Sequence, residues 1–167
     1  MMESEVLRVG VVLTPGFSLM AFASTIEPLR GANLIRGEII YSWTSLSAEG
    51  GTVCSGSGLE VVTSPLPAGA DFDMVIVCGG LGADNYRSKK LESFLRQGLR
   101  RNVIVGSVST GSFILAAAGL LDNRRCTVHW DYVESFREVF PNSMSAASSS
   151  SWTRAYSPAP AAAPPWI

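Results

Sequence analysis

The stretch VIVGSVSTGSFILAAAGLL, residues 103–121, joins an apolar run to an apolar helix through a tight turn of Ser, Thr and Gly. Its first half, VIVGSVS, is short and apolar, as expected of a central strand that is covered on both faces. Its second half, TGSFILAAAGLL, has the length and composition of a helix. We therefore expect Ser109 to stand at the carboxyl end of a parallel strand, where open α/β sheets bind ligands.

The same alternation of strand and helix recurs along the chain. VLRVGVVL (6–13) is an apolar strand before a Pro-Gly turn, and an apolar helix follows it. FDMVIVCGG (72–80) predicts another central strand, KKLESFLRQGLRR (89–101) an amphipathic helix, and 39–47 and 58–64 further strands. Such an order predicts an α/β fold, a three-layer doubly wound and mainly parallel sheet.

Length, charge and cysteine content narrow the functional classes. With 167 residues, 47% of them hydrophobic, we expect one globular domain. The net charge of −1 gives no sign of nucleic-acid binding by this chain alone. Three cysteines without metal-type spacing indicate neither a disulfide framework nor a metal site, which favours a reduced, cytoplasmic protein. No apolar run reaches the roughly 18 residues of a membrane span.

The composition changes abruptly after residue 141. Residues 142–167, NSMSAASSSSWTRAYSPAPAAAPPWI, are rich in Ser, Ala and Pro and show no periodicity. We therefore predict a domain over residues 1–141 and a disordered low-complexity tail over 142–167.

Four motifs occur together in the first part: TPGFSLMAFASTIEPLRGAN, VIVCGGLGADNY, GSVSTGSFILAAAGLLDNRRCTVHW and ESFREVFP. Over residues 6–141 the chain resembles the amidotransferase-like (ThiJ/PfpI-type) N-terminal domain of GlxA-type AraC-family transcriptional regulators. The resemblance implies a flavodoxin-like, class I glutamine amidotransferase-like fold. It also implies a strained nucleophile, usually cysteine, at the turn where this chain has Ser109, with Gly79 and Gly80 as the donor loop. The family's acidic residue corresponds to Glu27 and its histidine, loosely, to His129.

The regulator branch commonly lacks the cysteine. The resemblance then implies a homodimeric domain without cofactor or catalysis, which senses a small molecule such as a quaternary amine or an amino-acid-like metabolite. DNA is bound in that family by a separate C-terminal helix-turn-helix domain, which we do not expect in this chain. We expect the ligand to be bound by Glu27, Gly79, Gly80, Ser109, Thr110, His129 and Trp130.

The tail departs from the family, which should continue with a strand pair and a segment resembling CAGG. Synonymous codons for Asn142 to Trp166, read one frame over, can encode LDVSSELFVVDEGVFTCAGGSAAVD, which is of the expected kind. A frame-shifted tail and a natural low-complexity linker are therefore both open, and the DNA sequence distinguishes them. A truncated, inert gene product is a third reading of the chain.

An enzymatic alternative uses the same residues. Ser109 with His129 and Glu27 would compose a nucleophile, base and acid, and Gly79 and Gly80 an oxyanion hole, as in a ThiJ/PfpI-type hydrolase or glyoxalase-like enzyme. Ser107, however, occupies the position where a nucleophile elbow usually has glycine. The simpler roles for Ser109 are a helix N-cap or a pocket wall.

The aromatic and cysteine side chains near the predicted loops are further candidates for the same site. We expect one or two of Phe17, Tyr86, Phe113 and Trp130 to line the pocket, with Trp130 first. Cys78 ends a buried strand and should pack as a small apolar residue. Cys126 follows Arg124 and Arg125, which would lower the pKa of an exposed thiol.

Overall fold

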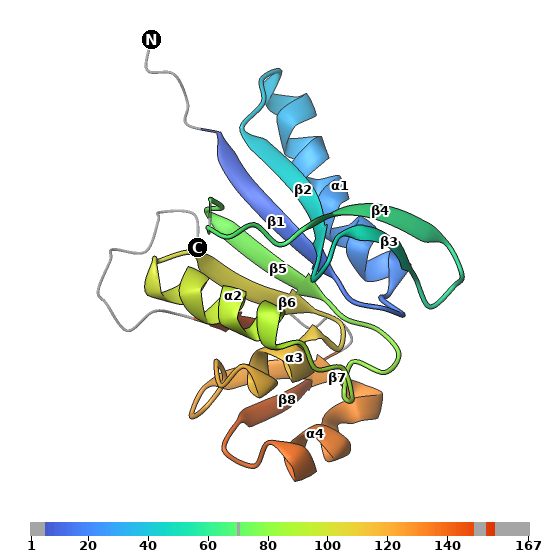
Figure 1. The fold of residues 1–167 in the computed structure, drawn as a ribbon, viewed down its shortest axis with the longest axis vertical. Coiled ribbons are helices and arrows are strands. Elements are labelled where there is room, and N and C mark those ends of the chain that lie inside the picture. Colours follow the sequence, from blue (N-terminus) through green and yellow to red (C-terminus); the bar gives the residue numbers. More distant parts are fainter. Residues whose placement is uncertain (1–5, 70, 149–152, 156–167) are drawn as a thin grey trace.

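The computed structural model describes residues 6–69, 71–148 and 153–155. A seven-stranded sheet in the order β3-β4-β2-β1-β5-β6-β9 forms its centre (Figure 1). The strands from β4 to β6 are parallel, whereas β3 and β9 pair antiparallel at the two edges. The bounds are β1 Leu7–Leu13, β2 Tyr41–Ser47, β3 Gly51–Cys54, β4 Glu60–Pro65, β5 Met74–Cys78, β6 Ile104–Val108 and β9 Thr153–Ala155. The predicted α/β fold with a mainly parallel sheet is confirmed.

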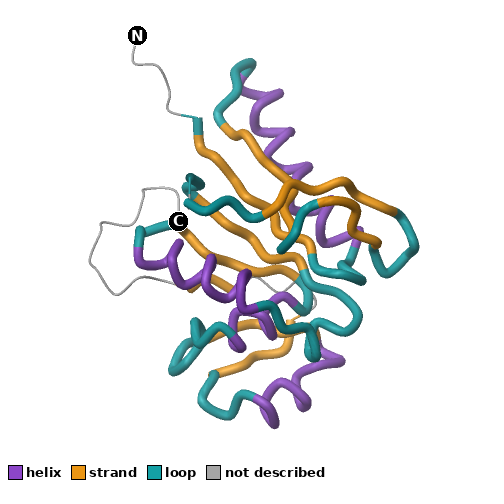
Figure 2. The backbone as a smooth tube through the Cα atoms, viewed as in Figure 1, coloured by secondary structure: helices purple, strands orange, loops and turns teal. Residues whose placement is uncertain are grey.

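Helices lie on both faces of this sheet, as Figure 2 shows. One face packs against α1 (Leu19–Arg36), and the other packs against α2 (Lys89–Arg100) and α3 (Gly111–Ala117). Successive residues of a strand point to opposite faces, so Val11 belongs to the apolar cluster under α1 and Val12 to the cluster under α2 and α3. The predicted three layers and double winding are therefore present.

A smaller unit follows the sheet. Strand β7 (Arg125–His129) pairs in parallel with β8 (Met144–Ser148), and between them lie the short 3-10 helix η1 (Trp130–Tyr132) and α4 (Val133–Val139). Phe136 of α4 is fully buried and meets the ring of Phe113 from α3 edge-on, with ring centroids 4.9 Å apart. This contact attaches the smaller unit to the core beneath α3.

The predicted tail is wrong for two segments, because β8 and β9 are strands. Both form backbone ladders with strands of the domain, β8 with β7 and β9 with β6. A β-ladder needs only backbone N–H and C=O groups, so an edge strand can pair with a segment that lacks the apolar pattern of a typical strand. Asn142 and Ser143 form the turn before β8, residues 149–152 and 156–167 lie outside the described residues, and the frame-shift explanation stays a hypothesis.

The strand order reverses between β1 and β5. The chain passes from β1 to β2 on one side, whereas β5 and β6 continue the sheet on the other. Leu13 is level with Cys78, and Cys78 with Val108, so the three central strands end at the same height. The next residues, Thr14, Gly79 and Ser109, therefore begin three loops side by side, at a position where doubly wound sheets bind ligands.

Candidate functional site

An open cleft of about 480 Å³ lies at these carboxyl ends. Its walls come from the loops after β1, β5 and β6, the β3–β4 hairpin loop, the start of α1, and the end of β7 with η1. It is lined by Gly16, Phe17, Ser18, Leu19, Met20, Gly56, Ser57, Gly80, Leu81, Ser109, Thr110, His129, Asp131 and Tyr132. The cleft is therefore built from segments that are far apart in sequence.

Ser109 occupies the turn between β6 and α3 in a left-handed conformation, with φ of 57°. This conformation costs an L-residue with a Cβ about 1–2 kcal/mol, so the surrounding structure must hold the turn in place. The N-cap of α3 is Thr110 rather than Ser109. The N-cap alternative for Ser109 is therefore wrong, and the structure places Ser109 in the wall of the cleft.

Thr110 fixes the neighbouring glycine loop. Its buried hydroxyl donates a 2.7 Å hydrogen bond to the carbonyl oxygen of Gly80 instead of capping α3. Gly80 lines the cleft. A Cβ at Gly80 would overlap the carbonyl oxygen of Gly16, so only glycine allows the β1 and β5 loops to approach this closely.

Gly79, in contrast, does not line the cleft but connects the loops beneath it. Its N–H donates to Val108 O at 3.4 Å, and its carbonyl accepts from Ser18 N at 3.1 Å. A Cβ there would lie 2.5 Å from the backbone nitrogen of Gly111. Gly79 therefore joins three loops beneath the cleft, whereas Gly80 is the member of the pair that lines it.

His129 ends β7 and reaches the cleft with a partly exposed ring. Its Nδ1 accepts a hydrogen bond from the backbone N–H of Asp131 at 3.4 Å and lies 3.8 Å from the Asp131 carboxylate. Trp130 stacks on this imidazole with centroids 5.3 Å apart, but it is 62% exposed and is not among the residues that line the cleft. Trp130 thus borders the site through His129.

Glu27 is not brought together with Ser109 and His129. It lies on the outer side of α1, where its exposed carboxylate forms a 2.7 Å ion pair with Arg30. Met20 is the last residue of α1 that lines the cleft, and Glu27 follows it by two turns, roughly 10 Å along the helix axis. The set of nucleophile, base and acid considered from the sequence is therefore not assembled.

Among the aromatic candidates, the structure brings only Phe17 into the lining of the cleft. Phe113 is fully buried in the core, and Tyr86 packs against the same core cluster. Asp131, Tyr132, Ser57 and Leu81 line the cleft and were missed. Asp131 and Tyr132 directly follow His129, so the segment HWDY was the one sequence signal that could have indicated them.

None of the three cysteines lines the cleft, although the Cys78 thiol donates a 3.6 Å hydrogen bond to the carbonyl oxygen of Ser18, which does. Burial raises the pKa of Cys78 to about 12 and that of Cys126 to about 11. The arginines before Cys126 therefore do not activate it, because its thiol is buried rather than exposed. Neither buried thiol is ionised near neutral pH.

Among the helices described, none is long and apolar enough to cross a membrane. Over the same residues, no group of three or more His, Cys, Asp and Glu side chains is arranged to hold a metal ion.

Comparison with known proteins identifies the family. The profile of the DJ-1/PfpI family matches residues 7–146. The HTH-type transcriptional regulator GlxA of Rhizobium meliloti is 42% identical over 140 residues, covering 83% of this chain and 43% of that protein. The chain spans about two fifths of the length of the curated regulators that it matches.

A solved structure and an enzyme add to this comparison. The crystal structure of an AraC family transcriptional regulator from Pseudomonas putida is 31% identical, with a TM-score of 0.73 over 85% of this chain and 77% of that one. Isonitrile hydratase of Pseudomonas putida is 30% identical over 128 residues, covering 75% of this chain and 54% of the enzyme. The strand-to-helix turn at Ser109, the glycine loop beside it and the profile match agree, and the chain belongs to the DJ-1/PfpI family.

Proposed function

We propose that the chain is the small-molecule-sensing and dimerising domain of a cytoplasmic AraC-type transcriptional regulator, whose DNA-binding helices belong to a separate domain. The observation that supports this most is the hydroxyl of Ser109. It stands in the wall of an open cleft, at the strained turn where catalytic members of the superfamily usually have cysteine. The site thus keeps the geometry of a reaction centre and has a weaker nucleophile.

A serine hydroxyl becomes nucleophilic only when a base removes its proton. Glu27 is ion-paired with Arg30 away from the cleft, and Nδ1 of His129 accepts a hydrogen bond from Asp131 N. These positions favour binding over covalent chemistry. Ser109, Thr110 and Gly80 then form the polar wall against which a ligand rests.

The side chains of the cleft favour a ligand with a cationic group. Among the residues that the structure describes, the lining contains the carboxylate of Asp131 and no Lys or Arg. The rings of Phe17, His129 and Tyr132 belong to the same lining, and the face of an aromatic ring attracts a cation by about 0.5–2 kcal/mol. A quaternary amine or an amino-acid-like metabolite matches this combination.

Thermal unfolding of the purified chain tests the proposal. Betaines, carnitine and amino acids are added singly, and the effector should raise the unfolding temperature saturably, because binding at a hundredfold excess over Kd adds about 2.7 kcal/mol of stability. Asp131→Asn should weaken this stabilisation. Asp122→Asn, the same change at an exposed residue that is not in the cleft lining, should leave it intact. Equal responses of the two variants would contradict an Asp131-centred site.

An enzymatic function is the second candidate, favoured by the similarity to isonitrile hydratase. In that case Ser109 is the nucleophile and His129, which lines the same cleft, is the candidate base, whereas Glu27 stays outside the cleft. Esters, methylglyoxal and isonitriles are the substrates to assay, with Ser109→Ala as the matched variant. Turnover that disappears in Ser109→Ala would favour the enzymatic function over the sensing function. Stabilisation by an effector without turnover would support sensing.

A further inference from the structure

The charges of this chain are segregated along the sequence. Residues 87–125 contain eight of the 13 Lys and Arg but only two of the 14 Asp and Glu. The other residues contain five Lys and Arg and 12 Asp and Glu. The net charge of −1 therefore averages a strongly basic segment with an acidic remainder.

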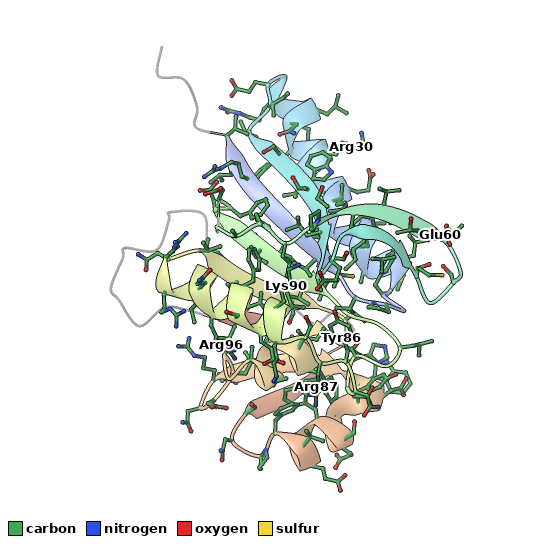
Figure 3. The ribbon with its side chains drawn as sticks, in the orientation of Figure 1. Arg30, Glu60, Tyr86, Arg87, Lys90 and Arg96 are labelled. Carbon is green, nitrogen blue, oxygen red and sulfur yellow. The ribbon has the colours of Figure 1, made fainter. Side chains whose placement is uncertain are left out.

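The fold gathers this segment on one surface, which we call the basic face. It consists of the solvent side of α2, the turn after it and the segment entering β7, with Lys89, Arg96, Arg100, Arg101, Arg124 and Arg125. The opposite side of α2 is buried through Leu91, Phe94, Leu95 and Gly98. Figure 3 shows Lys90 and Arg96 projecting from α2, well separated from Arg30.

Helix geometry and one hydrogen bond make the surface continuous. Lys89, Arg96 and Arg100 are seven and four residues apart, so they follow one side of α2 over roughly 16 Å. Arg96 Nη1 donates to the carbonyl oxygen of Ala118 at 3.3 Å. This bond ties α2 to the end of α3, from which the loop runs to Arg124 and Arg125.

Few carboxylates neutralise the basic face. Glu92 lies 3.8 Å from Arg96, and Glu49 pairs with Lys90 beside the face. Lys89, Arg100, Arg101, Arg124 and Arg125 form no ion pair with any residue that the structure describes. Clustered cations of this kind repel one another, and a bound polyanion relieves the repulsion.

We propose that the basic face binds the phosphate backbone of duplex DNA without reading its sequence, beside the site held by the separate DNA-binding domain. This inference rests on the proposed regulator function. Duplex DNA carries one charge per roughly 1.7 Å of axis, so several phosphates lie within the length of α2. Guanidinium groups, which make up most of the face, bind phosphate with two parallel hydrogen bonds.

The path of the chain agrees with this assignment. Strand β9 runs antiparallel to β6 and ends at Ala155, opposite Val105. Ala155, the last described residue, therefore lies near the start of β6, at the end of the strand that the turn with Arg101 precedes.

The test measures fluorescence anisotropy of a labelled duplex of arbitrary sequence, titrated with the full chain at low salt and at physiological salt. Wild type should bind at low salt and lose affinity steeply as salt rises. Arg100→Glu/Arg101→Glu should bind at least about tenfold more weakly, with a salt slope smaller by about 2, because two phosphate contacts are lost. Arg124→Glu/Arg125→Glu should behave alike and serves if the first variant unfolds.

The matched control is Arg30→Glu/Arg36→Glu on α1, which changes the net charge equally outside the basic face. If this control weakens binding as much as the first variant, or if wild type does not bind duplex at low salt, the inference is overturned. Binding of polyglutamate without duplex would overturn it as well, in favour of an acidic protein surface. Thermal stabilisation by an effector tests the cleft and does not involve the basic face. The sensing proposal and the DNA-binding proposal can therefore fail independently.

Discussion

Two neighbouring hydroxyls, those of Ser109 and Thr110, are presented by one turn to different surroundings. Ser109 adopts a left-handed backbone conformation in the cleft wall, whereas Thr110 bonds to Gly80 O. The second hydroxyl therefore determines the position of the loop that faces the first. At the scale of single residues, the shape of the cleft depends on a side chain that is itself buried.

We predict that Thr110→Val destabilises the protein while Thr110→Ser does not. Valine matches threonine in shape but leaves Gly80 O without this buried donor, which costs about 1–3 kcal/mol. Serine retains the donor. Urea unfolding gives the free energies of the three proteins, and a valine variant as stable as wild type would show that the 2.7 Å bond is not needed.

Cys78 makes stability depend on pH. Burial raises its pKa from 9.0 to about 12, so the unfolded chain loses the thiol proton at a lower pH than the folded one. The contribution is fully present below pH 9.0 and is lost as pH rises towards about 12. We expect wild type to lose about 1 kcal/mol more than Cys78→Ala between about pH 8 and about pH 10. Urea unfolding at both pH values measures this, and parallel losses would contradict the assignment.

The elements around the cleft depend on glycines that allow backbones to touch. A Cβ at Gly111 would overlap the carbonyl oxygen of Val77 and lie 3.0 Å from the Cβ of Ser107. Gly31 of α1 is the opposite case, because nothing lies within 4 Å of a Cβ built there. The first glycine holds α3 against β5, and the second only weakens its own helix.

We therefore predict opposite effects of the same substitution. Gly111→Ala should destabilise the fold by about 1–3 kcal/mol, because α3 must shift away from β5. Gly31→Ala should stabilise it by about 0.5–1 kcal/mol, because alanine orders the helix at lower entropic cost. Thermal unfolding compares the two variants. Gly31 lies three and four residues before the exposed Leu34 and Ile35, so a destabilised Gly31→Ala would mean that another copy of the chain packs too closely on this face for a methyl group.

At the scale of elements, the pattern of apolar residues predicted β1, β2, β4, β5 and β6 and the helices α1, α2 and α3, because burial requires apolar sequence, but it did not predict the short edge strand β3. It did not predict the orientation of α1 either. This helix has apolar residues on several sides, so its sequence does not select the buried one: Met20 is exposed, whereas Phe22 and Ile26 pack against the sheet. Strands β8 and β9 were missed because backbone pairing rather than side-chain pattern places them.

The sequence predicted the site residues that directly follow a predicted strand. It did not predict those brought to the site by contacts between distant loops. The predicted residues that line the cleft include Gly80 after β5 and Ser109 and Thr110 after β6. His129, at the end of β7, also lines it. Ser57 comes from a hairpin loop that crosses to the β1 loop, where Gly56 N donates to Phe17 O at 2.9 Å. No local sequence pattern predicts that this hairpin loop contacts the β1 loop. None predicts that the side chain of Glu27 lies on the exposed side of α1 either.

The whole molecule presents three different surfaces. The cleft lies at the carboxyl ends of the central strands, the basic face lies over α2, and exposed apolar side chains lie on α1. Figure 1 shows α1 and α2 on opposite faces of the sheet. Met20 belongs both to the cleft lining and to the exposed side of α1. A ligand that moves Met20 would therefore change the exposed apolar surface of α1, through which we expect two copies of the chain to associate. The size of this effect cannot exceed the difference between the ligand's binding free energies for the two positions of Met20.

The proposed homodimer makes the final prediction at this scale. Met20, Leu34 and Ile35 of α1 are 79%, 73% and 87% exposed, and the adjacent Leu34 and Ile35 follow Met20 by about four helical turns. Exposed apolar side chains grouped in this way mark association surfaces. We expect the chain to sediment as a dimer and Leu34→Glu/Ile35→Glu as a monomer, because burying two carboxylates in an interface is unfavourable.

Val139→Glu is the control for this dimer prediction, since Val139 is an exposed apolar residue on α4 and lies on another side of the molecule. It should leave the dimer intact. Sedimentation velocity across a range of protein concentrations separates the outcomes. If both variants remain dimeric, the copies associate through another surface, and Met20 then no longer connects the cleft to the partner. If wild type is monomeric, dimerisation belongs to other parts of the regulator, and the cleft must act on them through its own loops.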